Sequence, residues 1–301
     1  AAARRYFAVR AMGRGGGHMQ DLSCPVKRFG VGPESISERR KTMTRHGRQG
    51  REAARSDRAH DPSAVLLWGV HSVESALGNR ARPCKRLLVT SSGMERIAEA
   101  ARARGVRIEQ VGDAEIDRRL PKDAVHQGIL LEAGPLARIS FEEAVLDKDP
   151  GTRLVVVLDQ ITDPHNLGAI LRSSAGFGAT AVIVQERHSP PLTGIVAKAA
   201  SGALDRIPVA EVVNIARTLD EMKREGFQVF GFDSEAAYDL ASVNLTGDVA
   251  LVMGAEGDGL RRLVRETCDR LIRLPTLPRL PSLNVSNAAA VALYEAMRQR
   301  K

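Results

Sequence analysis

The sequence predicts an α/β protein in which a layered domain with a parallel sheet follows a smaller α/β domain. Short, continuous apolar runs alternate with helical patterns through the C-terminal half, as expected for strands buried on both faces of a parallel sheet. The chain has 301 residues, 43% of them hydrophobic and 27% charged, which is near the globular average and favours two domains. The longest apolar runs, such as 154–158 and 249–253, are too short to cross a bilayer, so we expect no membrane-spanning segment.

The positive charge is concentrated at the N-terminus. Residues 1–60 hold 14 Lys or Arg against 5 Asp or Glu, whereas the whole chain holds 44 against 36, so residues 61–301 hold 30 against 31. Because they lack sustained periodicity, residues 1–60 are predicted to be a disordered basic tail. Three interpretations stay open: an RNA-binding arm, an organelle transit peptide, and a leader from an overlong gene start with Met43 as the true start, which we favour.

Residues 61–136 are predicted to form the smaller α/β domain. Strands are expected over 65–69, 85–89, 106–111 and 128–132, and helices over 72–77 and 94–104. Gly105 follows the second helical pattern and predicts its end. Residues 137–151 are expected to be a linker with a short helix.

Residues 152–301 are predicted to form the parallel-sheet domain. Strands are expected over 154–159, 181–185, 207–209, 228–232, 249–253 and 271–274, and helices over 166–177, 193–203, 215–225, 260–266 and 287–300. Asn214 and Gly226 fit the two ends of one helix as cap residues. Ligands of such sheets bind beyond the carboxyl ends of the strands, so we expect the site there.

The first candidate stretch follows the strand at 154–159 and reads Thr162-Asp163-Pro164-His165-Asn166-Leu167-Gly168-Ala169-Ile170-Leu171-Arg172. Gly168 and Arg172 are four residues apart on one helix face, so the Arg172 side chain can lie across the bare backbone at Gly168 and reach the helix start, a place that suits a phosphate. The alternative is a surface arginine paired with Asp159 or Asp163. His165 is expected to be a turn residue first and a substrate contact second.

The second stretch, residues 249–260, runs from a strand into a glycine-rich turn. Gly254, Gly257 and Gly259 follow the order G-x-x-G-x-G, which differs from the dinucleotide-binding order G-x-G-x-x-G. The turn still lets a flat ligand approach the backbone closely. Glu256 would repel a pyrophosphate but suits a cationic ligand or ribose hydroxyls. A simple strand-to-helix turn remains the alternative for this stretch alone.

The third stretch, residues 271–287, contains Pro275, Pro278 and Pro281 and is expected to be a rigid loop after a strand. Either Asn284 or Ser286 is expected to cap the helix that follows. The serine and asparagine side chains at this helix entrance favour a polar site over an ordinary proline-rich loop.

Taken together, N-x-G-x-x-x-R, G-x-E-G-x-G and S-L-N-V-S, in this order, resemble the SpoU/TrmH family of RNA ribose 2′-O-methyltransferases, within the SPOUT superfamily. The resemblance covers about the last half of the chain. Residues 65–133 resemble the ribosomal-protein-like substrate-binding domain that often precedes this catalytic domain. Residues 162–168 and 198–203 are most similar to the branch that methylates a guanosine ribose in 23S rRNA.

The resemblance implies a deep C-terminal trefoil knot, S-adenosylmethionine bound in that knot, an RNA partner, no metal ion, and a homodimer whose sites are completed across the interface. Carried over by motif, the substrate and catalytic set is Asn166, Arg172, Glu256, Ser282 and Asn284. The cofactor pocket would be lined by Gly254, Leu274 and Leu283. The implied reaction moves a methyl group from a sulfonium to a ribose oxygen. Arg172 would activate that oxygen, either as a base or, since a guanidinium stays protonated, by stabilising the developing charge.

Other function classes stay open at this stage. A transfer-RNA ribose 2′-O-methyltransferase would need similar motifs, and a non-catalytic ribosome-assembly factor could keep the RNA-binding architecture. The glycine order argues against a nicotinamide-dependent dehydrogenase. With 4% aromatic residues, RNA binding is expected to use shape and phosphate contacts more than base stacking. Three scattered cysteines favour a reducing compartment, so a bacterial cytoplasm is expected, with a mitochondrion as the alternative.

Overall fold

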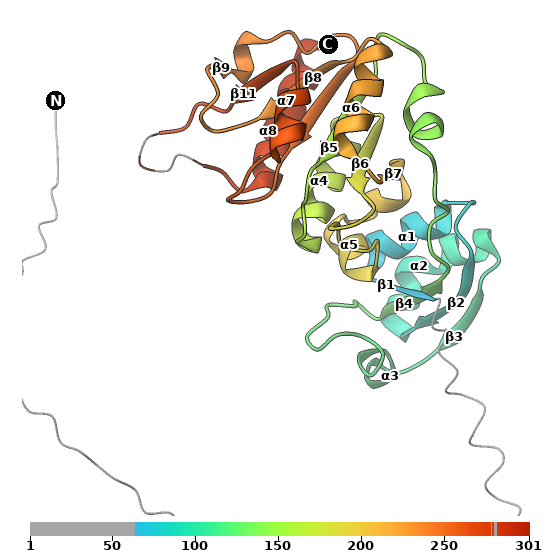
Figure 1. Ribbon diagram of the computed structural model, residues 1–301. Helices are drawn as coiled ribbons and strands as arrows, with labels where there is room; N and C mark the ends of the chain where they lie inside the picture. The colour runs from blue at the N-terminus through green and yellow to red at the C-terminus, as the bar shows by residue number, and fades with distance from the viewer. Residues whose placement is uncertain (1–63, 278, 280–281) are drawn as a thin grey trace, which may run out of the picture. The chain divides into compact units, whose positions relative to one another are not determined.

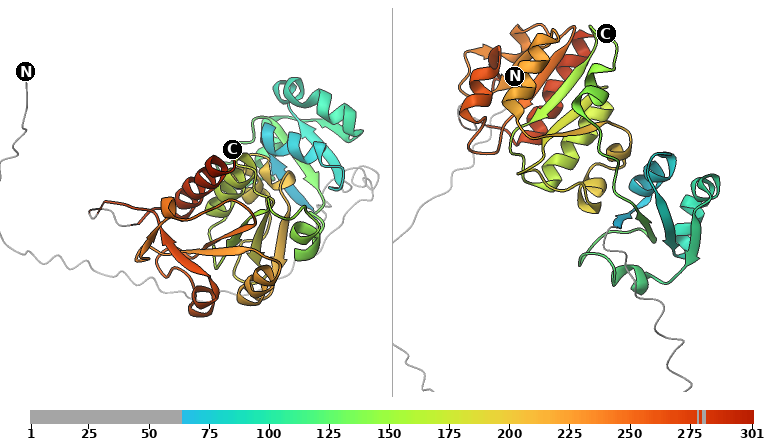
Figure 2. Two further views of the ribbon diagram at one scale, coloured as in Figure 1. Left: turned by 90° about the horizontal axis from the view of Figure 1, so that it is seen from above. Right: turned by 45° about the vertical axis from the view of Figure 1, so that its right-hand side comes forward.

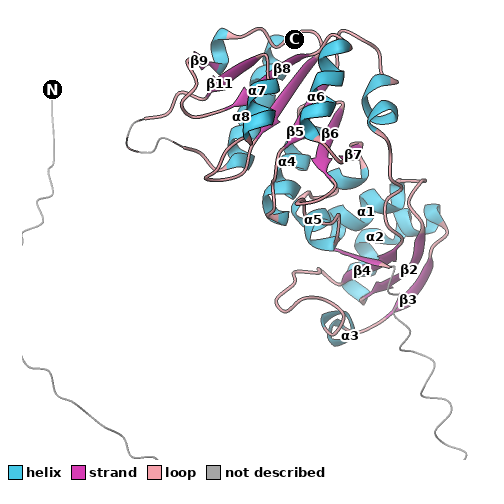
Figure 3. Cartoon of the chain, viewed as in Figure 1, coloured by secondary structure: helices cyan, strands magenta, loops and turns pink. Residues whose placement is uncertain are grey.

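The computed structural model describes residues 64–277, 279 and 282–301 of the chain (Figure 1). The predicted basic tail, residues 1–60, lies outside the described residues, as do Pro278, Leu280 and Pro281 of the proline-rich loop. Two sheets organise the described residues, one with four strands and one with seven (Figure 3).

The four-stranded sheet has the strand order β1-β4-β2-β3. Its strands are β1 (Val65–Trp68), β2 (Cys84–Val89), β3 (Arg107–Gln110) and β4 (Ile129–Ala133), and its helices are α1 (Val70–Gly78), α2 (Ser91–Arg104) and α3 (Asp113–Asp117). Strand β4 is antiparallel to both of its neighbours, whereas β2 and β3 are parallel. Local signals set the ends of α2: Thr90 Oγ1 accepts the Gly93 N–H at 3.2 Å, and Gly105 adopts a φ of 68° after the last turn.

The seven-stranded sheet has the order β7-β6-β5-β10-β8-β11-β9, and every neighbouring pair is parallel. Its strands are β5 (Leu154–Leu158), β6 (Ala181–Gln185), β7 (Val209–Val212), β8 (Gln228–Phe232), β9 (Tyr238–Asp239), β10 (Val249–Met253) and β11 (Arg270–Arg273). All residues of β5, β6 and β10 are buried, as their continuous apolar runs predicted. The carboxyl ends of the strands therefore share one edge of the sheet.

Helices cover both faces of this sheet (Figure 2). Residues of α4 (Pro164–Gly176), α5 (Gly194–Ala199) and α8 (Val285–Gln299) join one buried cluster with alternate strand residues such as Val156 and Leu251. Residues of the π-helical turn η1 (Glu142–Leu146), α6 (Ile215–Arg224) and α7 (Arg262–Thr267) join a second cluster with the intervening residues, such as Val155 and Ala250. The layered parallel-sheet architecture that the sequence predicted is confirmed.

Element boundaries differ from the sequence-based expectation in several places. Helix α4 begins at Pro164, two residues earlier than expected, because Asp163 Oδ1 accepts the His165 N–H at 3.0 Å and caps the helix. The helix expected over 193–203 ends at Ala199 as α5. Ser201 and Gly202 then adopt φ values of 48° and 89°, and the chain turns into the short helix η2 (Ala203–Asp205). A last short turn, η3 (Leu240–Ser242), precedes β10. Strand β9 and helix α3 were not anticipated.

Candidate active site

Three loops meet at the carboxyl edge of the seven-stranded sheet. Residues 159–163 follow β5, the glycine-rich turn 254–261 follows β10, and residues 274–284 follow β11. Strands β5 and β10 are hydrogen-bonded neighbours, so the first two loops leave the sheet side by side. The third loop ends at α8, and the first backbone N–H of that helix, on Val285, donates to Glu256 at 3.4 Å.

Asn166, Glu256 and Asn284 form a hydrogen-bonded cluster that joins the three loops. Glu256 Oε1 accepts Nδ2 of Asn166 at 3.1 Å and Nδ2 of Asn284 at 2.5 Å, and Asn284 Nδ2 also lies 3.0 Å from Asn166 Oδ1. Asn284 caps α8 as well, because its Oδ1 accepts the Ser286 N–H at 2.9 Å. Three residues from motifs up to 118 positions apart therefore lie in one cluster.

The glycine-rich turn folds back on itself. Ala255 and Gly259 exchange two backbone hydrogen bonds of 3.0 Å, and Gly257 and Gly259 adopt φ values of 90° and 66°. A Cβ added to Gly254 would lie 2.5 Å from both the Gly259 carbonyl oxygen and the Leu260 nitrogen, so no side chain fits there. The tight turn holds Glu256 in place beside Asn284.

A buried ion pair fixes the end of this turn to β5. The Asp159 carboxylate is fully buried; its Oδ2 accepts the Arg261 backbone N–H at 3.0 Å. Its Oδ1 accepts the Nε–H of Arg261 at 2.8 Å and forms an ion pair with Nη2 at 2.6 Å. The alternative in which Arg172 pairs with Asp159 is therefore wrong, because Arg261 already satisfies the carboxylate.

Two cavities lie on either side of the Glu256 segment. The larger, of about 580 Å³, is lined by residues of the glycine-rich turn and of the 274–284 loop, among them Gly254, Leu274, Ser282, Leu283 and Asn284. The smaller, of about 410 Å³, is lined by Gln160, Ile161, Thr162, Asp163, Asn166, His188 and Asp258. Ala255, Glu256, Asp258 and Val285 border both cavities. Both volumes are in the range of small-molecule sites.

Seven of the eight residues predicted for the site border these cavities, and Arg172 does not. Ser282 and Leu283 are exposed at the larger cavity. Arg172 is exposed on α4, about 9 Å further along the helix axis than Asn166, and forms no ion pair with any residue that the structure describes.

Gly168 has another role than the one expected for it. A Cβ at this position would lie 2.9 Å from the Val196 carbonyl oxygen and 3.0 Å from the Ala200 nitrogen, so the bare backbone lets α5 pack closely against α4. The prediction that the Arg172 side chain lies over Gly168 is wrong, because α5 occupies that space.

Sequence reasoning missed three residues that border the smaller cavity: Gln160, His188 and Asp258. Gln160 and His188 adopt φ values of 59° and 71°, which non-glycine residues rarely do, and which are often found near functional sites. Their positions just beyond β5 and β6 are the signal that would have found them. His165, by contrast, is exposed and borders neither cavity.

The described part of the chain has neither a metal-binding cluster nor a membrane-spanning helix. No group of three or more His, Cys, Asp or Glu side chains there has an arrangement that could hold a metal ion. Among the same residues, no helix has both the length and the apolar character needed to span a bilayer.

Sequence profiles of two families match this chain. The SpoU rRNA Methylase family matches residues 153–294, and the RNA 2′-O ribose methyltransferase substrate-binding family matches residues 66–138. The 23S rRNA (guanosine-2′-O-)-methyltransferase RlmB of Xanthomonas campestris is 40% identical over 241 residues, which cover 78% of this chain and 96% of that relative. The chain belongs to the SpoU rRNA methylase family.

Other relatives of this SpoU methylase carry the same name. RlmB of Ralstonia nicotianae is 42% identical over 239 residues, covering 78% of this chain and 96% of the relative. RlmB of Vibrio cholerae is 39% identical over 251 residues, covering 79% of this chain and 98% of the relative. The resemblance inferred from the three motifs is confirmed.

Solved structures have the same fold as this SpoU methylase. The SpoU methyltransferase AviRb from Streptomyces viridochromogenes, in complex with AdoMet, superimposes with a TM-score of 0.66 at 26% identity over 79% of this chain and 90% of that chain. An RNA 2′-O ribose methyltransferase gives a TM-score of 0.67 at 26% identity over 79% of this chain and 89% of that chain. The predicted fold class is confirmed, and the knot remains a prediction.

Proposed function

We propose that this protein transfers a methyl group from S-adenosylmethionine to the ribose 2′-hydroxyl of a guanosine in 23S rRNA. Relatives at about 40% identity carry this activity in their names, and they match this chain over nearly their whole length. The observation that carries the proposal is the cluster of Asn166, Glu256 and Asn284 between two cavities. One cavity suits a cofactor and the other suits an acceptor.

The larger cavity is assigned to the cofactor. Gly254 offers bare backbone, Leu274 and Leu283 offer apolar contacts, and the Glu256 carboxylate lies at the border, where it suits a cationic sulfonium. When bound, S-adenosylmethionine supplies an electrophilic methyl group, so the protein has only to align an acceptor oxygen with it. No metal ion is needed for this displacement.

The acceptor ribose is assigned to the cluster side of Glu256. Asn166 and Asn284 carry amide groups that can donate to and accept from sugar hydroxyls, and Ser282 adds a hydroxyl at the loop. Glu256 orients both amides, because its Oε1 accepts from each of them. These residues therefore position the ribose, while proton removal needs a further group.

Arg172 is assigned to the site of a second copy of this chain. Its exposed position outside both cavities fits a residue that completes a neighbouring site, and its charge would hold a phosphate or stabilise a developing alkoxide. An apolar patch supports the homodimer: Val291 and Tyr294 lie one turn apart on α8 and are 46% and 51% exposed. We also propose that the C-terminal domain contains the trefoil knot that the family resemblance implies.

Residues 61–136 are assigned to RNA binding, residues 137–151 to a linker, and residues 152–301 to methyl transfer. The match of the substrate-binding profile to residues 66–138 supports the first assignment. Bacterial relatives support a bacterial cytoplasm as the compartment.

Mapping of ribose methylation tests the proposed activity. In a strain that lacks the gene, one guanosine of 23S rRNA should lose its 2′-O-methyl group, and the purified protein with S-adenosylmethionine should restore it. Loss of methylation in a transfer RNA instead would overturn the substrate. Failure of calorimetry to detect S-adenosylmethionine binding would favour a non-catalytic assembly factor.

Subunit complementation tests the assignment of Arg172. Homodimers with Asn166→Ala and homodimers with Arg172→Ala should each be inactive. After mixing and subunit exchange, a mixed dimer should have up to about half the activity of the unaltered dimer. One of its two sites then combines an intact Asn166 with an intact Arg172. Arg172→Lys should restore little activity, since an ammonium lacks the guanidinium fork. Absence of recovery in proven mixed dimers would place Arg172 in its own chain's site.

A further inference from the structure

The smaller cavity is suited to the nucleoside that receives the methyl group, a role that the family motifs do not assign to it. It shares the border residues Glu256 and Asp258 with the larger cavity, and Asn166 points from α4 to Glu256 at that border. If the larger cavity holds the methyl donor, the nucleoside that receives the methyl group must enter from the smaller one. This step rests on the proposed function.

Three carboxylates border the smaller cavity, and they differ in how far the protein already uses them. Asp163 Oδ1 accepts the His165 N–H at 3.0 Å as a helix cap. Glu256 Oε1 accepts from two amides and one backbone N–H. Asp258 accepts no hydrogen bond and forms no ion pair with any described residue. Its carboxylate is therefore the one that is fully available to a ligand.

The backbone presents Asp258 in a defined direction. Gly257 and Gly259 on either side have φ values of 90° and 66°, and the paired hydrogen bonds between Ala255 and Gly259 close the turn at its base. The side chain consequently stands at the tip of a tight turn, at the border of the two cavities.

The chemistry of guanine fits such a carboxylate. Its N1–H and 2-amino groups are two neighbouring donors, which an ionised carboxylate can accept together, and charge-assisted hydrogen bonds of this kind are the stronger ones. Adenine has an acceptor at N1 in that position, so the same carboxylate would repel it. We propose that Asp258 is the specificity-determining residue that accepts the Watson–Crick edge of the target guanine.

Donors for O6, the acceptor on the same edge of guanine, are available in the same cavity. His188 follows β6 and Gln160 follows β5, both border the cavity, and neither side chain bonds to a described residue. Either can donate to guanine O6. The cavity therefore holds a free acceptor for the guanine donors and free donors for the guanine acceptor.

The experiment removes the 2-amino group from the base and, separately, the Asp258 carboxylate from the protein. The full-length enzyme is given an rRNA fragment that carries guanosine or inosine at the mapped target position; inosine differs by the lack of the 2-amino group. For the unaltered enzyme, kcat/KM should be about 10- to 100-fold lower on inosine, the value of one hydrogen bond to a charged group. For Asp258→Ala, the rate on guanosine should fall by more than this factor, because both hydrogen bonds are lost, and the two substrates should become equal. Asp258→Glu should restore part of the discrimination.

Glu235 supplies the matched control. It is an exposed carboxylate that borders only the larger cavity, so Glu235→Ala should leave the ratio between guanosine and inosine unchanged. Calorimetry with S-adenosylmethionine is run on each variant, because Asp258 also borders the larger cavity. If Asp258→Ala leaves the ratio of kcat/KM on guanosine to that on inosine unchanged, the inference is overturned. If the same variant also binds S-adenosylmethionine more weakly, Asp258 is assigned to the cofactor instead. Methylation of a different nucleotide would overturn the proposed function instead.

Discussion

The buried ion pair at the end of β5 gives a prediction whose size follows from its geometry. Asp159 is 0% exposed, accepts two hydrogen bonds from Arg261 at 3.0 and 2.8 Å, and forms an ion pair with its Nη2 at 2.6 Å. Asp159→Asn keeps the shape but removes the charge and turns one acceptor into a donor that faces the guanidinium. Breaking a fully buried pair costs about 3–5 kcal/mol, but the Arg261 side chain is 39% exposed and can be rehydrated. We therefore expect a loss of about 2–3 kcal/mol, the value of hydrogen bonds to a charged group.

Thermal unfolding measures this loss. At roughly 2–4 °C per kcal/mol for a domain of about 150–250 residues, the Tm should fall by about 4–12 °C. Affinity for S-adenosylmethionine should fall as well, because the pair anchors the turn that carries Gly254 and Glu256. Arg262→Ala is the control: Arg262 is adjacent but 76% exposed, and its pair with Glu266 should contribute less than about 1 kcal/mol. Equal losses in the two variants, or none in Asp159→Asn, would refute the reasoning.

Three further predictions concern packing, a thiol and pH. Gly168→Ala should cost about 1–3 kcal/mol in urea unfolding because α5 fills the space, whereas Gly176→Ala on the same helix, with nothing within 4 Å of the added Cβ, should be neutral or slightly stabilising; equal effects would contradict the packing argument. Burial raises the pKa of Cys268 to about 12, so the native protein should resist iodoacetamide at pH 8 at this thiol, and rapid labelling found by peptide mapping would count against it. Burial alone would raise the pKa of Asp248, but hydrogen bonds, including one of 2.6 Å from Arg153, hold it below its usual value. Stability from this pair should therefore be complete above about pH 4 and be lost as the pH falls through the lower folded-state pKa, and Asp248→Asn should flatten that part of the pH profile.

Much of the large sheet could be predicted because its signals are local. The apolar runs at 154–158 and 249–253 coincide with β5 and β10, since a strand buried on both faces has no polar positions to interrupt it. The convergence of motifs followed from topology, because parallel strands place the loops after them at one edge. Strand β9, with two residues, carries too little pattern to be recognised, and it exists because Ile272 and Arg273 of β11 pair with it.

Residues whose role depends on a distant partner could not be assigned. Gly168 looked like room for Arg172 because the two share a helix face, but the contact that fills this space comes from α5, some 30 residues later. Asp159 and Asp163 were the two candidate partners of Arg172, but the partner of Asp159 is Arg261, which lies 102 residues away. Spacing identifies what one helix face can present, but it does not reveal which other element occupies that face.

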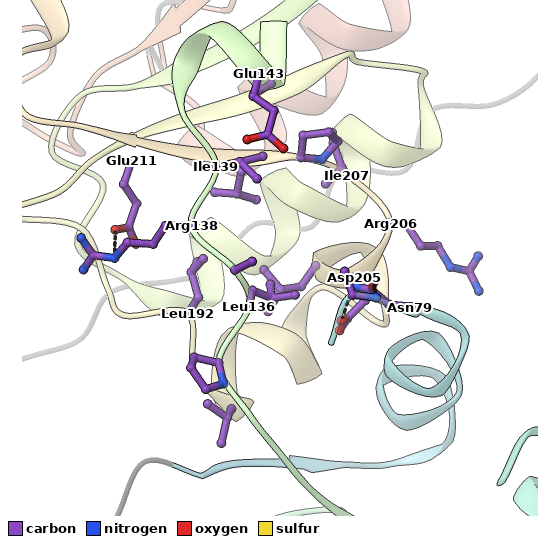
Figure 4. A pocket seen from close by; sticks show the side chains of 18 of the residues that line it. Asn79, Leu136, Arg138, Ile139, Glu143, Leu192, Asp205, Arg206, Ile207 and Glu211 are labelled. Carbon is purple, nitrogen blue, oxygen red and sulfur yellow. Dashed lines mark hydrogen bonds and ion pairs between the residues drawn. The ribbon is translucent and has the colours of Figure 1, made fainter. Parts of the chain in front are cut away.

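The structure also shows how the substrate-binding part is connected to the site. Helix α5 packs against α4 at Gly168, two residues from Asn166, and on its other side Ser72 of α1 donates through Oγ to the Ala197 carbonyl at 3.0 Å. The same segment carries a buried ion pair of 2.7 Å between Asp205 and Arg82, whose side chains are 1% and 0% exposed. A cavity of about 670 Å³, bordered by Arg138 and Asp205, lies next to this contact (Figure 4). These contacts join the domain of the four-stranded sheet to the helix that packs beside Asn166. Under the proposed function, binding energy gained far from the reacting atoms would help to orient the ribose, whose hydroxyl is a weak nucleophile.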